Sequence, residues 1–266
     1  MISSSLLLFC LLGAIVGFLA GLLGIGGGAL MVPAFISVFG WYGFSPDVLV
    51  HIAFGTSLAS IVFTAMSSAW AHHRMGAVDW KIFWRFAPGI LVGTYGGSVL
   101  ASVLPPLYLQ AAFACFLLYL AYNILHRQKQ TTGNRLPGAI WMSLVGVVIG
   151  VISGLVGIGG GALIVSFLVW RSIDMRNAIS TSAAVGFPLA VSGTIGYIMN
   201  GWGHPSLPEY TLGFVYLPAL LCIVIISMLT APLGVRLAHR MPVRTLRIIF
   251  ALFLIANASK VLIGLL

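Results

Sequence analysis

Long apolar runs separated by short polar segments make up most of this sequence. Runs of the length that a membrane-spanning helix needs, about 20 residues, are expected at residues 47–73, 82–104, 107–126, 177–200, 210–236 and 248–266. Asp47 follows Ser45-Pro46 and is expected to cap the first of these helices. The apolar runs at residues 6–40 and 138–170 differ, because glycines interrupt each of them.

The two interruptions have nearly the same sequence. The first is Gly24-Ile25-Gly26-Gly27-Gly28, and the second, half a chain length later, is Gly157-Ile158-Gly159-Gly160-Gly161. Each glycine costs a helix about 1 kcal/mol relative to alanine, so we expect each run to break into two helical arms here. Backbone exposed by such a break is tolerated in a membrane only where protein buries it or where it lines a wet cavity. The sequence leaves open whether the shorter second arms cross the membrane or re-enter it.

Other segments recur at matching places in the two halves. Residues 53–59 (AFGTSLA) match residues 178–184 (AISTSAA). These matches divide the chain into a first membrane repeat, residues 1–133, and a second, residues 134–266, within one integrated domain.

Loop charge predicts how the two repeats are oriented. The loop at residues 72–85 is basic and its counterpart at 201–209 has no Lys or Arg, whereas residues 104–106 are neutral and their counterpart at 236–247 has four arginines. Cytoplasmic loops are enriched in Lys and Arg, so equivalent loops are expected on opposite sides, which requires an odd number of crossings per half. We predict an all-α polytopic membrane protein with two inverted-topology repeats of about five transmembrane segments each, broken at the GxGGG motifs. Both termini are then outside a cell inner membrane.

Composition supports a membrane protein and excludes most soluble classes. Of the 266 residues, 60% are hydrophobic and 6% are charged, with a mean hydropathy of +1.11, whereas soluble domains carry about 25% charged residues. The net charge of +9 comes from loops beside the lipid bilayer, and no nucleic-acid partner is expected. Cys10, Cys115 and Cys222 lack metal-site or redox spacing. We expect no metal, no cofactor and no enzymatic activity, since no nucleophilic triad is arguable from spacing.

The glycine motifs are the first candidates for chemistry. Free N–H groups and the dipole at a helix start favour an anion, and glycine lets the backbone approach a ligand closely. Paired breaks in inverted repeats lie at the substrate sites of transporters. We therefore predict that Gly24, Gly26, Gly27, Gly28, Gly157, Gly159, Gly160 and Gly161 bind a small anionic substrate. Close helix packing is the alternative role, and it is the one expected for the spacing of Gly17 with Gly21 and of Gly150 with Gly154.

A partial likeness of the first glycine motif to a dinucleotide-binding fingerprint is excluded. That fingerprint requires a strand and a soluble βαβ unit around it, and the composition provides neither.

Hydroxyl side chains form the second group of candidates. Thr56 and Ser57 match Thr181 and Ser182 in the other half, and all four are predicted to contact the substrate. The alternative is a hydrogen bond to the helix carbonyl four residues earlier. His51 and Arg176 each precede one of these threonines by five residues. They are candidates for gating or proton-linked roles, with an interfacial position as the alternative.

These residues resemble the sulfite exporter TauE/SafE family of membrane transporters. The resemblance covers nearly the whole chain and also includes Gly76-Ala77-Val78-Asp79-Trp80 after the second span. It implies a bacterial-type inner-membrane carrier, often one that exports sulfite or organosulfonates such as sulfoacetate. The second repeat departs from the first at Ser180, where the first has Gly55, and at Ser166, where the first has Pro33.

The predicted function is secondary transport of a small anion, most simply export of sulfite or an organosulfonate by alternating access. No nucleotide-binding motif is present, so a gradient must drive it. The membrane potential favours anion export by about 2.3 kcal/mol per charge per 100 mV. The alternatives are an anion channel or a membrane subunit of a partner enzyme system, and a homodimer is compatible with any of these.

Overall fold

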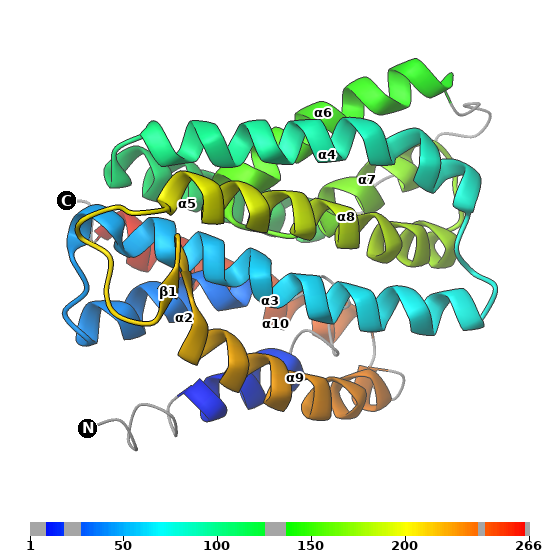
Figure 1. The fold of residues 1–266 in the computed structure, drawn as a ribbon. Helices are drawn as coiled ribbons and strands as arrows, with labels where there is room; N and C mark the ends of the chain where they lie inside the picture. The colour runs from blue at the N-terminus through cyan, green and yellow to red at the C-terminus, as the bar shows by residue number, and fades with distance from the viewer. Residues whose placement is uncertain (1–8, 19–27, 126–136, 239–242, 264–266) are drawn as a thin grey trace.

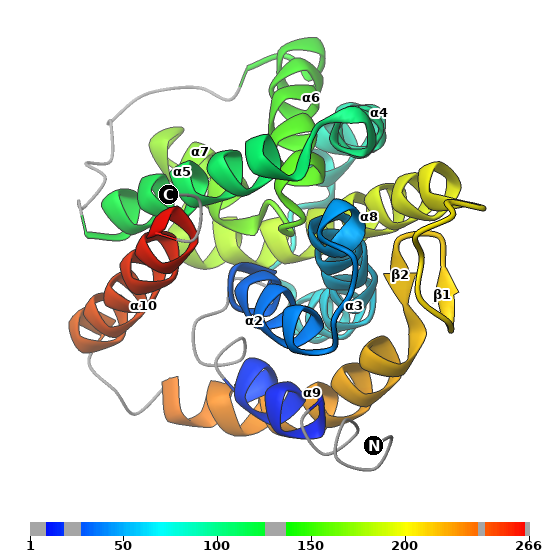
Figure 2. The same cartoon turned by 90° about the vertical axis from the view of Figure 1, so that its left-hand side faces the viewer.

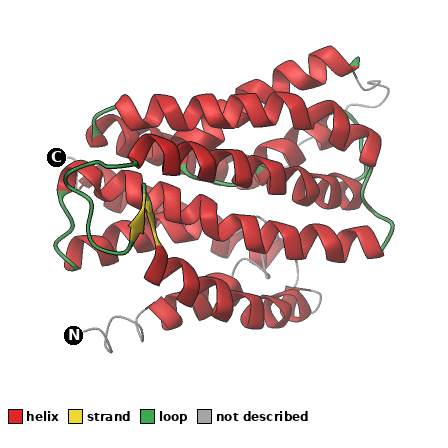
Figure 3. Cartoon of the chain, viewed as in Figure 1, coloured by secondary structure: helices red, strands yellow, loops and turns green. Residues whose placement is uncertain are grey.

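The computed structural model describes residues 9–18, 28–125, 137–238 and 243–263 (Figure 1). Apart from one short hairpin, the regular elements in these ranges are helices (Figure 3). After a first helix, Phe9–Phe18, they are α2 (Gly28–Trp41), α3 (Pro46–Arg74), α4 (Trp80–Val103), α5 (Pro106–Leu125), α6 (Ala139–Val156), α7 (Gly161–Trp170), α8 (Met175–Gly201), β1 (Thr211–Leu212), β2 (Val215–Tyr216), α9 (Leu217–Ala238) and α10 (Val243–Ile263).

Five of the described helices are long and apolar enough to cross a membrane, namely α3, α4, α5, α6 and most of α8. The expectation of an all-α multi-pass membrane protein is confirmed at this level. Helix α7 has only 10 residues, or roughly 15 Å at 1.5 Å per residue. It is too short to cross a hydrocarbon core of about 30 Å by itself.

Three expected helix starts are wrong. Helix α10 already includes Val243, five residues before the expected start at residue 248. Asp47 is not a cap, because Ser45 takes the N-cap position of α3 and Pro46 occupies the first turn, where its missing N–H costs nothing. Helix α9 begins at Leu217 rather than near residue 210, because Thr211–Leu212 and Val215–Tyr216 pair as an antiparallel hairpin.

Helices α3 and α8 form the centre of the molecule and run antiparallel. His72, late in α3, lies 3.0 Å from Ser180, early in α8, and Gly55, early in α3, faces Tyr197, late in α8. In the turned view, other helices lie on most sides of this pair, and the β1–β2 hairpin lies on the remaining side (Figure 2). The apolar window of α3 is 78% buried, compared with 39% for α5 and α6. The outer helices therefore present the apolar side chains that lipid would cover.

Helix α4 packs against α6 along a seam of glycines. The members are three on α4, Gly89, Gly93 and Gly97, and three on α6, Gly146, Gly150 and Gly154. A Cβ on Gly93 would strike the main-chain carbonyl of Val147, and a Cβ on Gly150 would lie 2.7 Å from the main-chain nitrogen of Thr94. The seam thus brings the two backbones together, as small residues do between membrane helices. The spacing of Gly150 and Gly154 predicted this role correctly.

Each glycine-interrupted unit returns toward the end of the molecule where it started. In the first, the Phe9 ring lies 5.8 Å from the Tyr42 ring, just beyond the end of α2. In the second, Phe86 of α4 contacts both the middle of α6 and late α7: its ring lies 5.7 Å from that of Phe167, and its side chain is 3.4 Å from the Cβ position of Gly146. The second unit, α6 and α7, is therefore a helical hairpin with its glycine break at the tip.

Candidate functional site

The second glycine break forms a tight turn between α6 and α7. Helix α6 ends at Val156, and Gly157 caps it in the left-handed conformation, with φ of 69°. Gly160, the N-cap of α7, is also left-handed, with φ of 59°. Ile158 N–H donates to the Ser153 carbonyl at 3.1 Å, which satisfies a carbonyl that the helix end would otherwise leave free. Glycine is the residue that adopts this backbone at no steric cost.

The described part of the first motif lies against this turn. Gly24, Gly26 and Gly27 lie outside the described residues, and Gly28 is the first residue of α2. A Cβ on Gly28 would lie 3.2 Å from Ile158 Cα and 3.4 Å from Gly159 N. The start of α2 and the turn before α7 therefore touch, although they come from opposite halves of the chain.

Ile61 shows where along α3 this contact lies. It lies near the middle of the 29-residue α3. Its Cδ1 would be 2.8 Å from a Cβ on Gly28, and its Cγ2 would be 3.2 Å from a Cβ on Gly159. Gly28 and the second glycine motif therefore meet around the middle of the central helix, away from either end of the bundle.

Ser57 and Ser182 hydrogen-bond to the main chain at the second break. Ser57 Oγ donates to the Gly157 carbonyl at 2.9 Å, and Ser182 Oγ donates to the Gly161 carbonyl at 2.9 Å. They join the central helices α3 and α8 to the two ends of the turn. The alternative bond to the carbonyl four residues earlier is made instead by Ser60 and Ser180.

Thr56 and Thr181 make matching bonds across the two halves. Thr56 Oγ1 accepts from Tyr216 N–H of β2 at 3.0 Å. Thr181 Oγ1 accepts from Asp79 N–H, just before α4, at 2.9 Å. Each threonine is fully buried and holds a main-chain segment from the other half. The structure therefore assigns both threonines a contact within the protein.

His51 and Arg176 lie apart, near opposite ends of the α3–α8 pair. The His51 ring is buried and stacks on Phe214 at 5.1 Å, and its Nε2 lies 3.0 Å from the Ala101 carbonyl of α4. Arg176 is exposed at the start of α8, where its N–H donates to Asp174. In the described part of the chain, neither residue hydrogen-bonds to the glycine break.

Sequence reasoning missed two buried hydroxyls. Ser153 in α6 and Thr94 in α4 are fully buried, and within the described residues neither hydroxyl has a hydrogen-bond partner. A Cβ on Gly160 would lie 2.7 Å from Ser153 Oγ. The available signal was the serine within the second Gly-x-x-x-Gly segment, where the first half has Ala20.

Cationic side chains gather at one end of the described bundle. They are His72, His73, Arg74, Lys81, Arg85, Arg171 and Arg176. At the other end, residues 42–45, 104–105 and 202–216 have no Lys or Arg. Lys260 is nearest to that end, and its Nζ donates to Ser37 of α2 at 2.9 Å.

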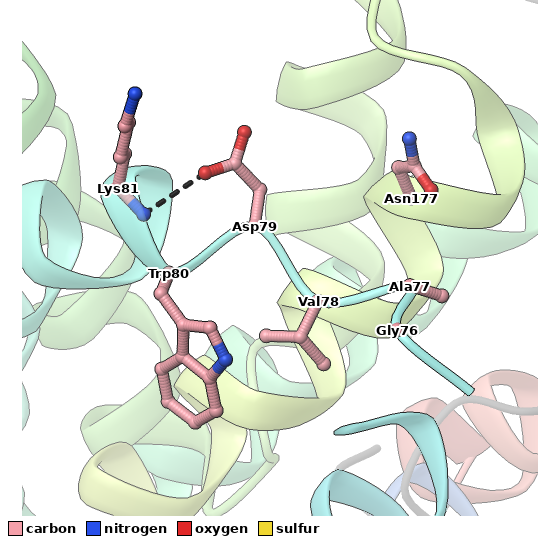
Figure 4. A pocket seen from close by; sticks show the side chains of 7 residues that line it. All are labelled: Gly76, Ala77, Val78, Asp79, Trp80, Lys81 and Asn177. Atoms are coloured by element: carbon pink, nitrogen blue, oxygen red, sulfur yellow. Dashed lines mark hydrogen bonds between the residues drawn. The ribbon is translucent and has the colours of Figure 1, made fainter. Parts of the chain in front are cut away.

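An open pocket of about 440 Å³ lies at the basic end (Figure 4). Residues 76–81 and Asn177 line it, and Asp79 Oδ1 accepts from Lys81 N–H at 2.9 Å. Asp79 thus caps α4, so its carboxylate neutralises the positive end of that helix. This pocket is not at the glycine motifs, and its carboxylate makes it a poor anion site. In the described part of the chain, no three His, Cys, Asp or Glu side chains come together as a metal site requires.

Ser57→Ala tests how far the turn depends on α3. We expect a loss of about 1–3 kcal/mol in stability, because a buried carbonyl is left without its donor. The thermal unfolding temperature of the purified protein measures this. Ser102→Ala is the control, since Ser102 bonds only to the Val99 carbonyl of its own helix. Equal unfolding temperatures for the two variants would contradict the assignment.

Comparisons with known proteins agree across most of the chain. The sequence profile of the family described as Sulfite exporter TauE/SafE matches residues 9–261. A probable membrane transporter protein of Haemophilus influenzae is 40% identical over 256 residues, covering 95% of this chain and 96% of that protein. A probable membrane transporter protein of Bacillus subtilis is 30% identical over 244 residues, covering 89% and 90%. No solved structure matches.

Proposed function

Since this chain belongs to the sulfite exporter TauE/SafE family, we propose that it is a secondary carrier that exports a small anion by alternating access. Sulfite or an organosulfonate such as sulfoacetate is the proposed substrate. The observation that carries this proposal is the contact between Gly28, where α2 begins, and the turn at Ile158-Gly159, which leads into α7.

Two helix starts converge at this contact. The first N–H groups of α7 have no carbonyl within their own helix to pair with, and the dipoles of α7 and of α2, which is described from Gly28 on, place positive potential there. The site is buried beside the middle of α3, and in such low-dielectric surroundings these donors interact strongly with charge. A small oxyanion is the ligand that this arrangement would favour.

We propose further that the two halves are inverted repeats related by an axis between α3 and α8. The reciprocal bonds of Thr56 and Thr181 support this relation, as does the antiparallel course of α3 and α8. The first helix packs on α9 as α6 packs on α4, because Gly17 faces the Ser227 backbone of α9 as Gly150, its match in the second half, faces the Ile90 carbonyl of α4. In this mechanism one half rocks against the other, and the glycine contact is exposed to each side in turn.

The proposed orientation follows from charge. The protein lies in the inner (plasma) membrane with its basic end facing the cytoplasm, since Lys and Arg are retained on the cytoplasmic side. Phe9, at the start of the first helix, and Lys260, in the last turns of α10, both lie toward the other end. Both termini are therefore proposed to face outward.

Counterflow in proteoliposomes tests the transport proposal. Vesicles loaded with unlabelled sulfite or sulfoacetate should accumulate labelled substrate transiently, and the rate should saturate at high substrate concentration. Vesicles loaded with acetate should show no such accumulation. A channel would give neither exchange acceleration nor saturation. A membrane subunit of a larger system would be inactive alone, and either outcome would reject the carrier.

A further inference from the structure

Ser153 differs from the other hydroxyls around the second break. Ser57 and Ser182 bond to the carbonyls of Gly157 and Gly161, and Tyr197 OH donates to the Gly154 carbonyl at 2.9 Å. Ser153 Oγ is equally buried but has no partner in the described part of the chain. A buried hydroxyl without a hydrogen bond destabilises a fold, so its retention here calls for a compensating role.

The Ser153 hydroxyl is directed at the start of α7. A Cβ on Gly160, the N-cap of α7, would lie only 2.7 Å from Ser153 Oγ. Glycine at this position therefore leaves Ser153 Oγ facing the first turn of a 10-residue helix. The hydroxyl donor and the free N–H groups of α7 lie next to each other, and all of them favour the same kind of ligand.

This arrangement has no sequence counterpart in the first half. The position that matches Ser153 is Ala20, which lies between Gly17 and Gly21 as Ser153 lies between Gly150 and Gly154. A hydroxyl is available only from the second repeat at this position. The binding site is therefore asymmetric even though the two glycine motifs are nearly identical.

We propose that Ser153 Oγ donates a hydrogen bond to an oxygen of the transported oxyanion, which the main-chain N–H groups at the start of α7 also bind. The anion is thus held against the second repeat. This assignment rests on the proposed function and adds a named ligand to its site. Pyramidal or tetrahedral sulfur oxyanions suit it, since they offer separate oxygens to the hydroxyl and to the amides.

Ser153→Ala is the test, with affinity and stability measured separately. Calorimetry on the purified protein in detergent should give a sulfite Kd about 10- to 100-fold weaker than wild type, the range expected for a lost hydrogen bond to a charged group. Sulfoacetate should be measured in parallel. Without anion, the variant should unfold at the wild-type temperature or above, because the alanine leaves no group unpaired.

Thr94→Val is the matched control, since it removes a second fully buried hydroxyl that has no partner in the described residues. Its anion Kd should stay within about twofold of wild type. An unchanged Kd for Ser153→Ala would overturn the assignment while leaving transport intact. Equal weakening by Thr94→Val, or a lower unfolding temperature for Ser153→Ala with an unchanged Kd, would also overturn it. Failure of wild type to bind either anion would overturn both this inference and the proposed function.

Discussion

Replacement of Gly93 by leucine should lower the thermal unfolding temperature more than any other single change considered for this protein. Gly93 lies in the middle of the α4–α6 seam, and even a Cβ there would strike the Val147 carbonyl. Backbone cannot move aside as a flexible side chain can, so α4 and α6 would have to separate. Overpacking costs about 3 kcal/mol or more in such a place, which corresponds to roughly 10 °C in Tm.

Gly96→Leu provides the control on the same helix. Gly96 is exposed, and a Cβ there would meet nothing within 4 Å. Leucine is a better helix former than glycine by nearly 1 kcal/mol, so this variant should be at least as stable as wild type. The unfolding temperatures of both variants are measured in detergent, and gel filtration follows. Similar unfolding temperatures would show that the seam does not hold α4 and α6 together.

Replacement of Gly160 by alanine should reduce transport at least tenfold. The left-handed backbone costs a side-chain-bearing residue about 1–2 kcal/mol. The new Cβ would also lie 2.6 Å from Leu189 Cδ1 and 2.7 Å from Ser153 Oγ. The turn must therefore shift, and it would carry the first N–H groups of α7 away from the contact with Gly28. Initial counterflow rates, corrected for the amount of folded protein, measure the effect.

Gly43→Ala separates backbone strain from the effect at the site. Gly43 is also left-handed, with φ of 71°, but a Cβ there would meet nothing within 4 Å. This variant should lose a similar amount of stability from strain and keep the wild-type transport rate. If Gly160→Ala transported as fast as Gly43→Ala, the turn before α7 would not be part of the substrate site.

The hydrophobic pattern was enough to predict most of the helices. The expected spans at residues 82–104 and 107–126 differ by one or two residues from α4 and α5, because apolar run length and the flanking Pro105-Pro106 are local features. The glycine run at Gly157–Gly161 does separate two helices, α6 and α7. The family resemblance is confirmed by the profile match over residues 9–261. The inverted relation of the halves, the site and the substrate stay predictions.

Partners far apart in the sequence were decided only by the tertiary structure. The glycines of α4 looked ordinary in the sequence, yet they pair with those of α6 along a seam. Thr56 and Thr181 are predicted to contact substrate, and the structure adds that the hydroxyl oxygen of each accepts a hydrogen bond from an N–H in the other half of the chain. A hydroxyl's type and spacing do not reveal which backbone group it will meet after folding.

The sequence by itself determined most of the helical segments, the helix break at Gly157–Gly161, and the family of the chain, since these depend on run length, glycine strain and motif. Only the tertiary structure decided that Gly28 touches the turn at Gly159 and that Ser153, beside it, has no hydrogen-bond partner among the described residues. Those outcomes depend on how whole helices pack, and close approach of two backbones is set by the complete set of side chains between them.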